Sequence, residues 1–265
     1  GLAIMGFGFA SLVAGPLMQI LIAKFGLVQN FVILACIYAV VMTASALYLE
    51  PPKKVVVESK GEFKAKLPEQ GQFTVQQAMY TWQFYALWWI FFTNITCGIG
   101  LLAVASPMAQ EVIGMSPIAA ASMVGIIGLL NGGGRIVWST ISDYLGRANT
   151  YIIFFIIEIA AFYLLGGVTD SFMFQLLVFI IITCYGGGFS CMPAYLSDLF
   201  GTKQLSAIHG RILTAWGLAG IAGPLLLSVI YERTHSYSVT LYFFSASFII
   251  SLALALVLKL KGKTA

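Results

Sequence analysis

Long apolar segments separated by short polar breaks dominate the pattern of this chain. Eight of these segments are long and apolar enough to cross a hydrocarbon core about 30 Å thick as an α-helix. Their predicted bounds are 2–22, 28–49, 84–104, 116–140, 150–167, 172–196, 210–230 and 238–259. Most of the breaks are short, so neighbouring helices are expected to run antiparallel. The pattern therefore predicts an all-α polytopic membrane protein.

One polar break is much longer than the others. Residues 50–80 contain Pro51-Pro52, five lysines and four glutamates, which is typical of a soluble connector. Near its end, Thr74-Val-Gln-Gln77 has the form of a capping box and predicts a helix that leads into the span 84–104. The expected domains are a pair of helices at 1–49, a linker at 50–80 and a six-helix bundle at 81–265.

Composition excludes several classes of protein. Mean hydropathy is +0.93, and 9% of the residues are charged, against about 25% in an ordinary soluble domain. The net charge of +4 lies in loop lysines, without a basic face interleaved with aromatic residues, so no nucleic-acid partner is expected. The four cysteines have no C-x-x-C spacing, and there is no phosphate loop, metal cluster or nucleophile–base pair. We expect neither a cofactor nor enzymatic activity.

The distribution of cations predicts the orientation. Lys24 and Arg233 fall on one side of the predicted membrane, and Arg135 falls within it. The other eleven cations share the opposite side: Lys53, Lys54, Lys60, Lys64, Lys66, Arg147, Lys203, Arg211, Lys259, Lys261 and Lys263. Because cytoplasmic loops are enriched in Lys and Arg, the 50–80 loop and the C-terminus are predicted to be cytoplasmic, in the plasma or inner membrane.

The most informative single residue is Arg135. It follows an uncharged stretch from Ser116 to Leu130, and it lies eight residues before Asp143, roughly 12 Å along an α-helix. An arginine near the membrane midplane costs at least ~2.5 kcal/mol unless it faces a polar cavity or a partner, so it indicates a pathway or binding site. Its planar group suits a carboxylate, to which it can donate two parallel hydrogen bonds.

A short repeat supports this interpretation. Ala14-Gly15-Pro16-Leu17 in the first span recurs as Ala222-Gly223-Pro224-Leu225 in the seventh. Both helices are expected to run from the cytoplasm outward, as in transporters built from two same-direction repeats. The Gly-Pro pairs would allow helix bending during transport, and simple kinks are the alternative.

Several motifs resemble the major facilitator superfamily and, within it, the oxalate/formate antiporter family. The loop Ser139-x-x-x-Asp143-x-x-Gly146-Arg147 is similar to the superfamily signature between helices 8 and 9, with Ser139 and Tyr144 replacing its usual glycine and cation. The other carrying motifs are Asn131-Gly-Gly-Gly-Arg135, Gly188-Phe-Ser-Cys-Met-Pro193-Ala194, Ser197-Asp198-x-Phe200-Gly201-Thr202 and Thr214-Ala-Trp216-Gly217. The resemblance implies helices 5 to 12 of twelve, and we expect the chain to be the C-terminal portion of a longer protein.

The resemblance also implies roles for individual residues. Arg135 matches an arginine that binds substrate carboxylate, and Tyr185 and Phe189 match aromatic positions that line the same cavity. Trp216 stands where the oxalate exchangers have a lysine, which favours a monocarboxylate over a dianion, or coupling to protons. Asn131, four residues before Arg135, would orient the guanidinium or touch the substrate.

Other interpretations stay open at this stage. Arg135 would serve structure alone if it paired with Glu158, and Trp216 would serve packing. The glycines at 132–134 and 186–188 would allow either close helix packing or exposure of the backbone to a cavity, and packing is the favoured interpretation. Asp143, Gly146 and Arg147 are expected to form a cytoplasmic network that holds one conformational state.

The predicted function is secondary transport of a small organic anion such as formate, lactate, pyruvate or oxalate. The expected partners are this carboxylate, the lipid bilayer, and either a proton or a counter-anion, with a monomeric full-length protein. An exporter of hydrophobic or weakly charged compounds and a non-transporting membrane sensor are the alternatives.

Overall fold

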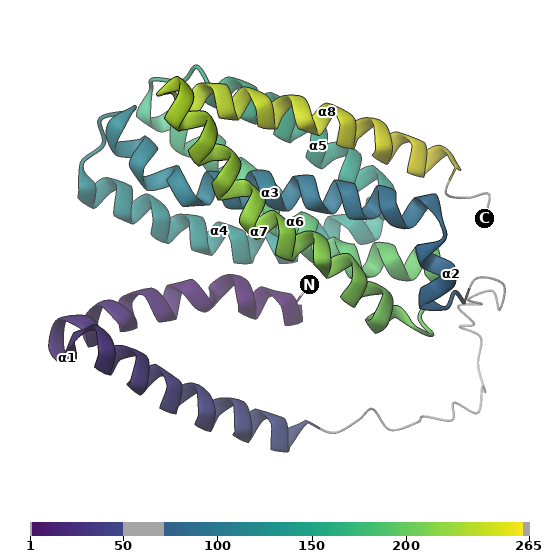
Figure 1. The fold of residues 1–265 in the computed structure, drawn as a ribbon, viewed down its shortest axis with the longest axis horizontal. Coiled ribbons are helices and arrows are strands. Elements are labelled where there is room, and N and C mark those ends of the chain that lie inside the picture. The colour runs from purple at the N-terminus through teal and green to yellow at the C-terminus, as the bar shows by residue number, and fades with distance from the viewer. Residues whose placement is uncertain (1, 50–71, 262–265) are drawn as a thin grey trace. The chain divides into compact units, whose positions relative to one another are not determined.

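The computed structural model describes residues 2–49 and 72–261, which form eight α-helices and, within those ranges, no strand. They are α1 (Leu2–Tyr48), α2 (Val75–Met79), α3 (Trp82–Glu111), α4 (Pro117–Leu145), α5 (Arg147–Leu165), α6 (Ser171–Phe200), α7 (Leu205–Thr234) and α8 (Tyr237–Lys261) (Figure 1). The prediction of an all-α fold is confirmed.

Helix α1 contains the first two predicted spans. Gly26 interrupts its helical geometry with φ of 81°, a left-handed conformation that favours glycine, so α1 consists of two arms that meet there. The break lies between the predicted spans 2–22 and 28–49. Ser11 and the described residues that follow it in α1 belong to one compact unit, and the helices from α2 onward belong to another.

Seven helical segments in the described ranges are long and apolar enough to cross a membrane. They are residues Ile20–Tyr48 of α1 and the six helices from α3 to α8. Helices α3, α6, α7 and α8 extend beyond their predicted spans at both ends, whereas α4 extends only at its C-terminal end and α5 only at its N-terminal end. Polar residues cap the start of several of them. Ser116 and Asp170, for example, accept hydrogen bonds from the first turns of α4 and α6.

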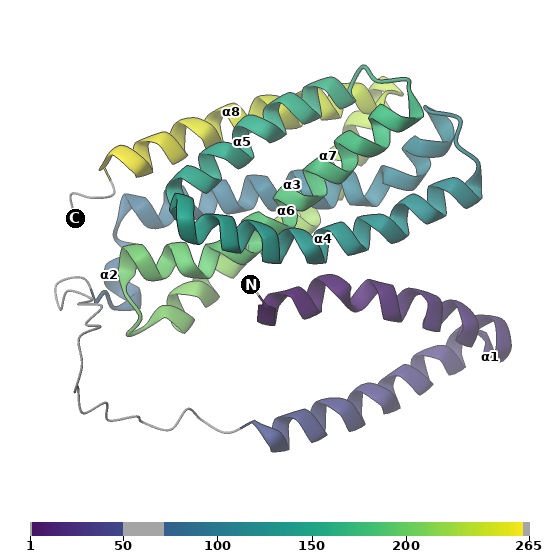
Figure 2. The same ribbon diagram turned by 180° about the vertical axis from the view of Figure 1, so that it is seen from behind.

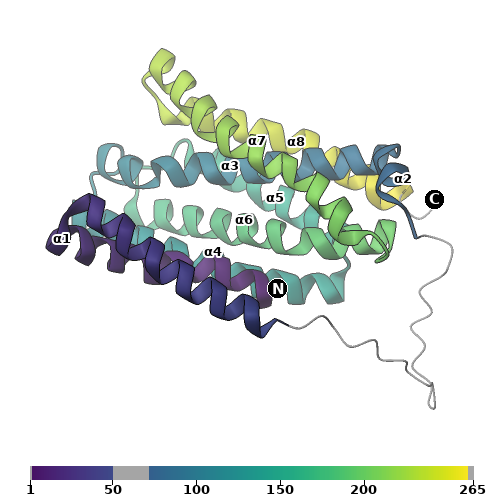
Figure 3. The ribbon, with the colours of Figure 1, turned by 60° about the horizontal axis from the view of Figure 1, so that its bottom comes forward.

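The six long helices from α3 to α8 form a bundle in which α3 and α6 are the most buried. Helix α7 packs against α3, α4 against α6, and α8 against α5, while α3 and α6 contact each other (Figure 2, Figure 3). Helix α6 thus carries its side chains toward α3, α4 and α5. The three-part division of the chain at residues 50 and 81 stays a prediction.

Glycines allow the closest contacts between helices of this bundle. A Cβ atom at Gly134 of α4 would lie 2.7 Å from the carbonyl oxygen of Thr183 on α6. A Cβ atom at Gly186 of α6 would lie 2.4 Å from the carbonyl oxygen of Asn131 on α4. The predicted packing role of these glycines is confirmed, since any larger residue would push α4 and α6 apart.

The end of the predicted connector is anchored to the α6–α7 turn. The predicted capping box is present: Gln77 N donates to Thr74 Oγ1 and Thr74 N donates to Gln77 Oε1. Phe73 N donates to the carbonyl oxygen of Phe200 at 2.9 Å, and Val75 N donates to Gln204 Oε1 at 2.7 Å. A break at Thr81, whose hydroxyl caps α3, separates α2 from α3. The rest of the predicted linker, residues 50–71, lies outside the described residues.

Candidate functional site

Arg135 lies in the middle of α4, and its side chain is buried, with 1% of its surface exposed. Its Nε atom donates a hydrogen bond to Asn131 Oδ1 at 3.2 Å, one helical turn earlier. Residues four apart in a helix share a face, so the amide holds the guanidinium along the α4 surface. The orienting role predicted for Asn131 is the one that this contact supports.

An aromatic ring from α6 faces the Arg135 guanidinium and contacts a second ring from α7. The Arg135 Cζ atom lies 4.9 Å from the centre of the Phe189 ring, a cation–π geometry. The Phe189 ring in turn meets Trp216 edge-on, with centroids 6.1 Å apart. Trp216 is partly exposed. The fold therefore joins three of the predicted site residues, from three helices, into one continuous group.

Tyr185 lies one turn before Phe189 on α6 and is buried. Its ring fills the space beside Gly98 of α3, where an added Cβ would lie 2.2 Å from the ring. The side chain is close enough to Arg135 for the two to interact electrostatically. All five predicted site residues thus belong to one region of the bundle.

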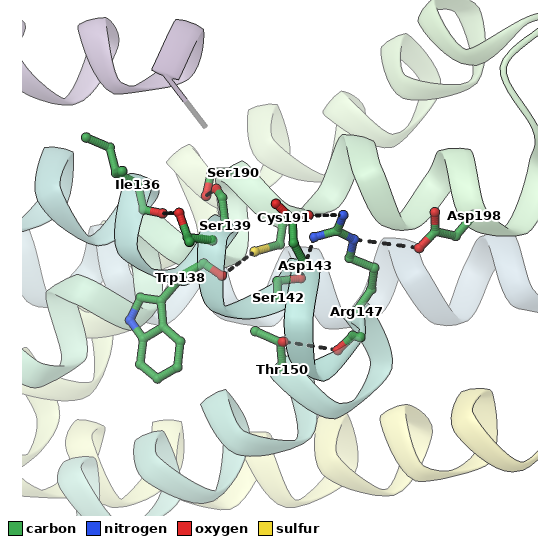
Figure 4. Close-up of polar contacts among 12 residues, drawn as sticks. Ile136, Trp138, Ser139, Ser142, Asp143, Arg147, Thr150, Ser190, Cys191 and Asp198 are labelled. Carbon is green, nitrogen blue, oxygen red and sulfur yellow. Dashed lines mark hydrogen bonds and ion pairs between the residues drawn. The ribbon is translucent and has the colours of Figure 1, made fainter. Parts of the chain in front are cut away.

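The backbone of Arg135 is also held, by two serines that sequence reasoning did not single out as site residues. Ser190 Oγ of α6 donates to the carbonyl oxygen of Arg135 at 3.0 Å, and Ser139 Oγ donates to the same oxygen. The two hydroxyls are 2.9 Å apart, and Figure 4 shows them side by side between α4 and α6. Ser190 lies inside the motif 188–194, which pointed to this part of α6. The sequence did not show that its partner is the Arg135 carbonyl on α4.

The buried Glu158 does not pair with Arg135. Its carboxylate oxygens accept hydrogen bonds from Asn94 Nδ2 of α3 at 3.1 and 3.3 Å. Within the described residues, both ion pairs involve Arg147. The alternative of a structural Arg135–Glu158 pair is therefore wrong.

The predicted charge network forms where α4, α5 and α6 end or begin. Gly146, with φ of 84°, is the single residue between α4 and α5 and adopts a conformation that favours glycine. Arg147 contacts Asp143, donates to Ser142 Oγ at 2.8 Å, and lies 3.6 Å from Asp198 Oδ2 (Figure 4). Sequence reasoning quoted Asp198 in a motif without giving it a role. The cluster ties the α4–α5 turn to α6; its role in gating stays a prediction.

Of the two Gly-Pro pairs, the structure describes the contacts of the one in α7. Helix α7 continues through Gly223 and Pro224, and a Cβ at Gly223 would lie 2.5 Å from the carbonyl oxygen of Thr96 on α3. Gly223 thus allows α3 and α7 to approach closely. The side chains at Gly15 and Pro16 in α1 lie outside the described ones. The bending role of both pairs stays a prediction.

Comparison with known proteins settles the family. The family model described as Major Facilitator Superfamily matches residues 1–189 and, in a second match, residues 134–264. The chain belongs to the Major Facilitator Superfamily. The all-helical fold and the seven apolar segments agree with this assignment, and the protein is a multi-pass membrane protein.

Three relatives within the curated proteins are named as transporters. The chain is 26% identical over 221 residues to an uncharacterized MFS-type transporter, YhjX, of Escherichia coli (strain K12), covering 83% of this chain and 54% of the relative. It is 26% identical over 226 residues to the oxalate:formate antiporter of Oxalobacter formigenes, covering 84% and 52%. It is 22% identical over 211 residues to monocarboxylate transporter 9 of Gallus gallus, covering 71% and 40%.

The chain spans about half the length of the first two of these relatives. The names of all three relatives refer to membrane transport. The substrate is not given by membership of the superfamily and depends on the residues of the site.

Proposed function

We propose that the full-length protein is a secondary transporter of a small monocarboxylate, such as formate, lactate or pyruvate, and that it works by alternating access in the plasma or inner membrane. The observation that carries the proposal is the buried Arg135, held by Asn131 and placed over the Phe189 ring. Relatives named for oxalate, formate and monocarboxylates support the same class of substrate.

Arg135 supplies the charge that recognises the carboxylate. Nε is engaged by Asn131, and a planar guanidinium has the shape that suits a bidentate contact with a carboxylate. A carboxylate bound there offsets the cost of an arginine inside the membrane. Occupancy therefore favours the states in which the site is closed to water, which couples binding to the conformational change.

The aromatic side chains set the size and number of charges of the substrate. Phe189 presents its ring to the guanidinium and Trp216 packs against Phe189, and neither supplies a second cation. A monocarboxylate with a short organic tail matches one cation beside an apolar wall. A dicarboxylate such as oxalate would require another cation to offset its second charge, because a buried, uncompensated charge is costly.

Arg135→Gln tests this function in the full-length protein reconstituted in proteoliposomes. Because a hydrogen bond to a charged group contributes about 1.5–3 kcal/mol, the variant should lose about 10- to 100-fold in apparent affinity for the monocarboxylate. Arg233→Gln, at the exposed end of α7, makes the same chemical change outside the site and should behave as wild type. Uptake of labelled formate, lactate, pyruvate and oxalate, with competition by uncharged analogues, measures the effect.

Unchanged affinity and uptake in Arg135→Gln would contradict the proposal. Effective competition by the uncharged analogues would instead favour an exporter of weakly charged compounds. Transport of oxalate that equals that of the monocarboxylates would contradict the assignment to a singly charged substrate.

A further inference from the structure

The bundle contains a second buried ionisable group that the proposed binding site does not use. Among the described residues, Arg135 and Glu158 are the charged side chains that are fully buried, each with 1% of its surface exposed. Glu158 lies in α5, and its contact with Asn94 joins α5 to α3 across the bundle. A carboxylate removed from water requires compensation by a cation, by several hydrogen bonds, or by a proton.

The Glu158 carboxylate accepts hydrogen bonds from a single donor among the described residues. Asn94 Nδ2 faces both carboxylate oxygens, at 3.1 and 3.3 Å, so one amide nitrogen supplies both contacts. Asn94 is fully buried, and its Oδ1 atom has no hydrogen-bond partner in the structure. An ionised carboxylate only accepts hydrogen bonds, so it cannot satisfy this oxygen.

A proton on Glu158 completes the bonding of both groups. The protonated carboxyl has an O–H donor, and a modest rotation of the Asn94 amide would let Oδ1 accept it while Nδ2 donates to the other carboxyl oxygen. This acid–amide pair has two hydrogen bonds and no net charge. It is the protonation state that suits a dry environment, because no buried polar atom of the pair is then left without a partner.

Among the described residues, no positively charged side chain pairs with Glu158. Within the described residues, its nearest ionisable neighbours are Tyr151 on α5, Cys97 on α3 and Cys184 on α6, all normally neutral at pH 7. Helix α8, which packs against α5, contributes the Phe248 ring and a hydroxyl of Ser245 that is already bonded to a main-chain oxygen. None of these side chains supplies a positive charge.

One segment of α6 contacts both Arg135 and Asn94, the hydrogen-bond partner of Glu158. A Cβ at Gly188 would lie 2.5 Å from Asn94 Oδ1, and the carbonyl oxygen of Gly188 accepts a hydrogen bond from Tyr151. The next two residues, Phe189 and Ser190, contact the guanidinium and the carbonyl oxygen of Arg135. A shift of this segment during the transport cycle would therefore alter both sites together.

We propose that Glu158 and Asn94 form a proton-binding site, and that the protein carries one proton with each monocarboxylate anion. The coupling rests on the proposed function; the proton site itself does not. Binding of the anion at Arg135 and of the proton at Glu158 leaves the loaded bundle with both interior charges compensated. The proton and the monocarboxylate anion together carry no net charge. Such electroneutral transport avoids an uncompensated charge inside the membrane when the site is closed to water.

Infrared spectroscopy of the purified full-length protein tests the proton site without any substrate. At pH 7 the wild type should show the carbonyl band of a protonated, buried carboxyl group. The band should be absent from Glu158→Gln, which retains the shape of the protonated acid, and present in Glu232→Gln, which makes the same change at an exposed position of α7. Absence of the band from the wild type at pH 7 would overturn the site.

Proteoliposomes with an outside pH one unit below the inside test the coupling. One-to-one symport should concentrate the labelled monocarboxylate about tenfold in the wild type and in Glu232→Gln. Glu158→Gln should not concentrate it, yet should still exchange internal for external substrate, which shows that the variant is folded and that Arg135 functions.

The outcomes separate the two proposals. The coupling would be overturned if Glu158→Gln accumulated the monocarboxylate to the same level as the wild type, or if a sodium gradient drove the accumulation instead. In either case, uptake that depends on Arg135 would still uphold the proposed function. Failure of the wild type to move any monocarboxylate would overturn the proposed function and the coupling together, and the infrared band would still decide whether Glu158 binds a proton.

Discussion

The guanidinium of Arg135 receives its orientation from two contacts of different kinds. Asn131 holds Nε by a hydrogen bond, and the Phe189 ring faces Cζ. The aromatic contact adds attraction for a cation without supplying an anionic partner that would compete with a substrate carboxylate. The two contacts come from different residues, so each can be removed by a single substitution and its effect on substrate binding measured separately.

Phe189→Leu should weaken substrate binding while leaving the fold intact. Loss of a cation–π contact worth about 0.5–2 kcal/mol would allow the guanidinium to move, which predicts an affinity lower by about 2- to 30-fold. Phe172→Leu, at an exposed position near the start of the same helix, is the matched control and should have no effect. Direct binding of labelled monocarboxylate to the purified protein checks both variants; equal affinity in both would contradict the support role.

At the scale of elements, the close approach of α4 and α6 positions the site. Gly134 and Gly186 allow backbone contact between α4 and α6 in the turn that leads to Arg135, and Ser190 adds a hydrogen bond across the same contact. Because both helices are long and run together, a displacement at one glycine would move Arg135 relative to Phe189.

Gly134→Ala should destabilise this helix pair, and Gly133→Ala should not. A Cβ at Gly134 meets the Thr183 backbone at 2.7 Å, whereas nothing lies within 4 Å of a Cβ at Gly133. Overpacking costs about 1–3 kcal/mol, while alanine at an open helical position is neutral or slightly stabilising. Thermal unfolding of the detergent-purified proteins measures the difference. Equal melting temperatures of the two variants would show that α4 and α6 accommodate the added methyl group at no cost in stability.

At the scale of the whole molecule, the distribution of cations predicts how the helices are oriented in the membrane. Helix α7 has 30 residues, a length of about 45 Å, so its two ends reach opposite faces of a bilayer. The excess of cations on one side predicts that the α6–α7 turn, with Lys203, is cytoplasmic and that Arg233 is outside.

Single cysteines at the two ends of α7 test this orientation. Cys36 is exposed and is replaced by serine, while the buried Cys97, Cys184 and Cys191 are retained. In intact cells, a membrane-impermeant maleimide should label Arg233→Cys and should label Lys203→Cys only after permeabilisation. The reverse pattern would invert the predicted topology.

The sequence by itself determined the helices, their approximate bounds and the family, because each of these depends on local hydropathy, capping residues and short motifs. It also identified Arg135, since a charge within an apolar stretch is visible without a fold. Contacts between helices were not available to it. The capping box at Thr74 was predicted, for example, but its anchoring to the α6–α7 turn was not.

Only the tertiary structure decided which distant side chains meet. It placed Phe189 against Arg135 and Trp216 against Phe189, gave Arg147 a second acidic neighbour in Asp198, and joined Glu158 to Asn94 rather than to Arg135. Helical periodicity specifies which face of one helix a residue occupies, but the partner helix is chosen by packing over the whole bundle. For that reason the depth of Glu158 was predictable from the sequence, whereas its dependence on a single amide was not.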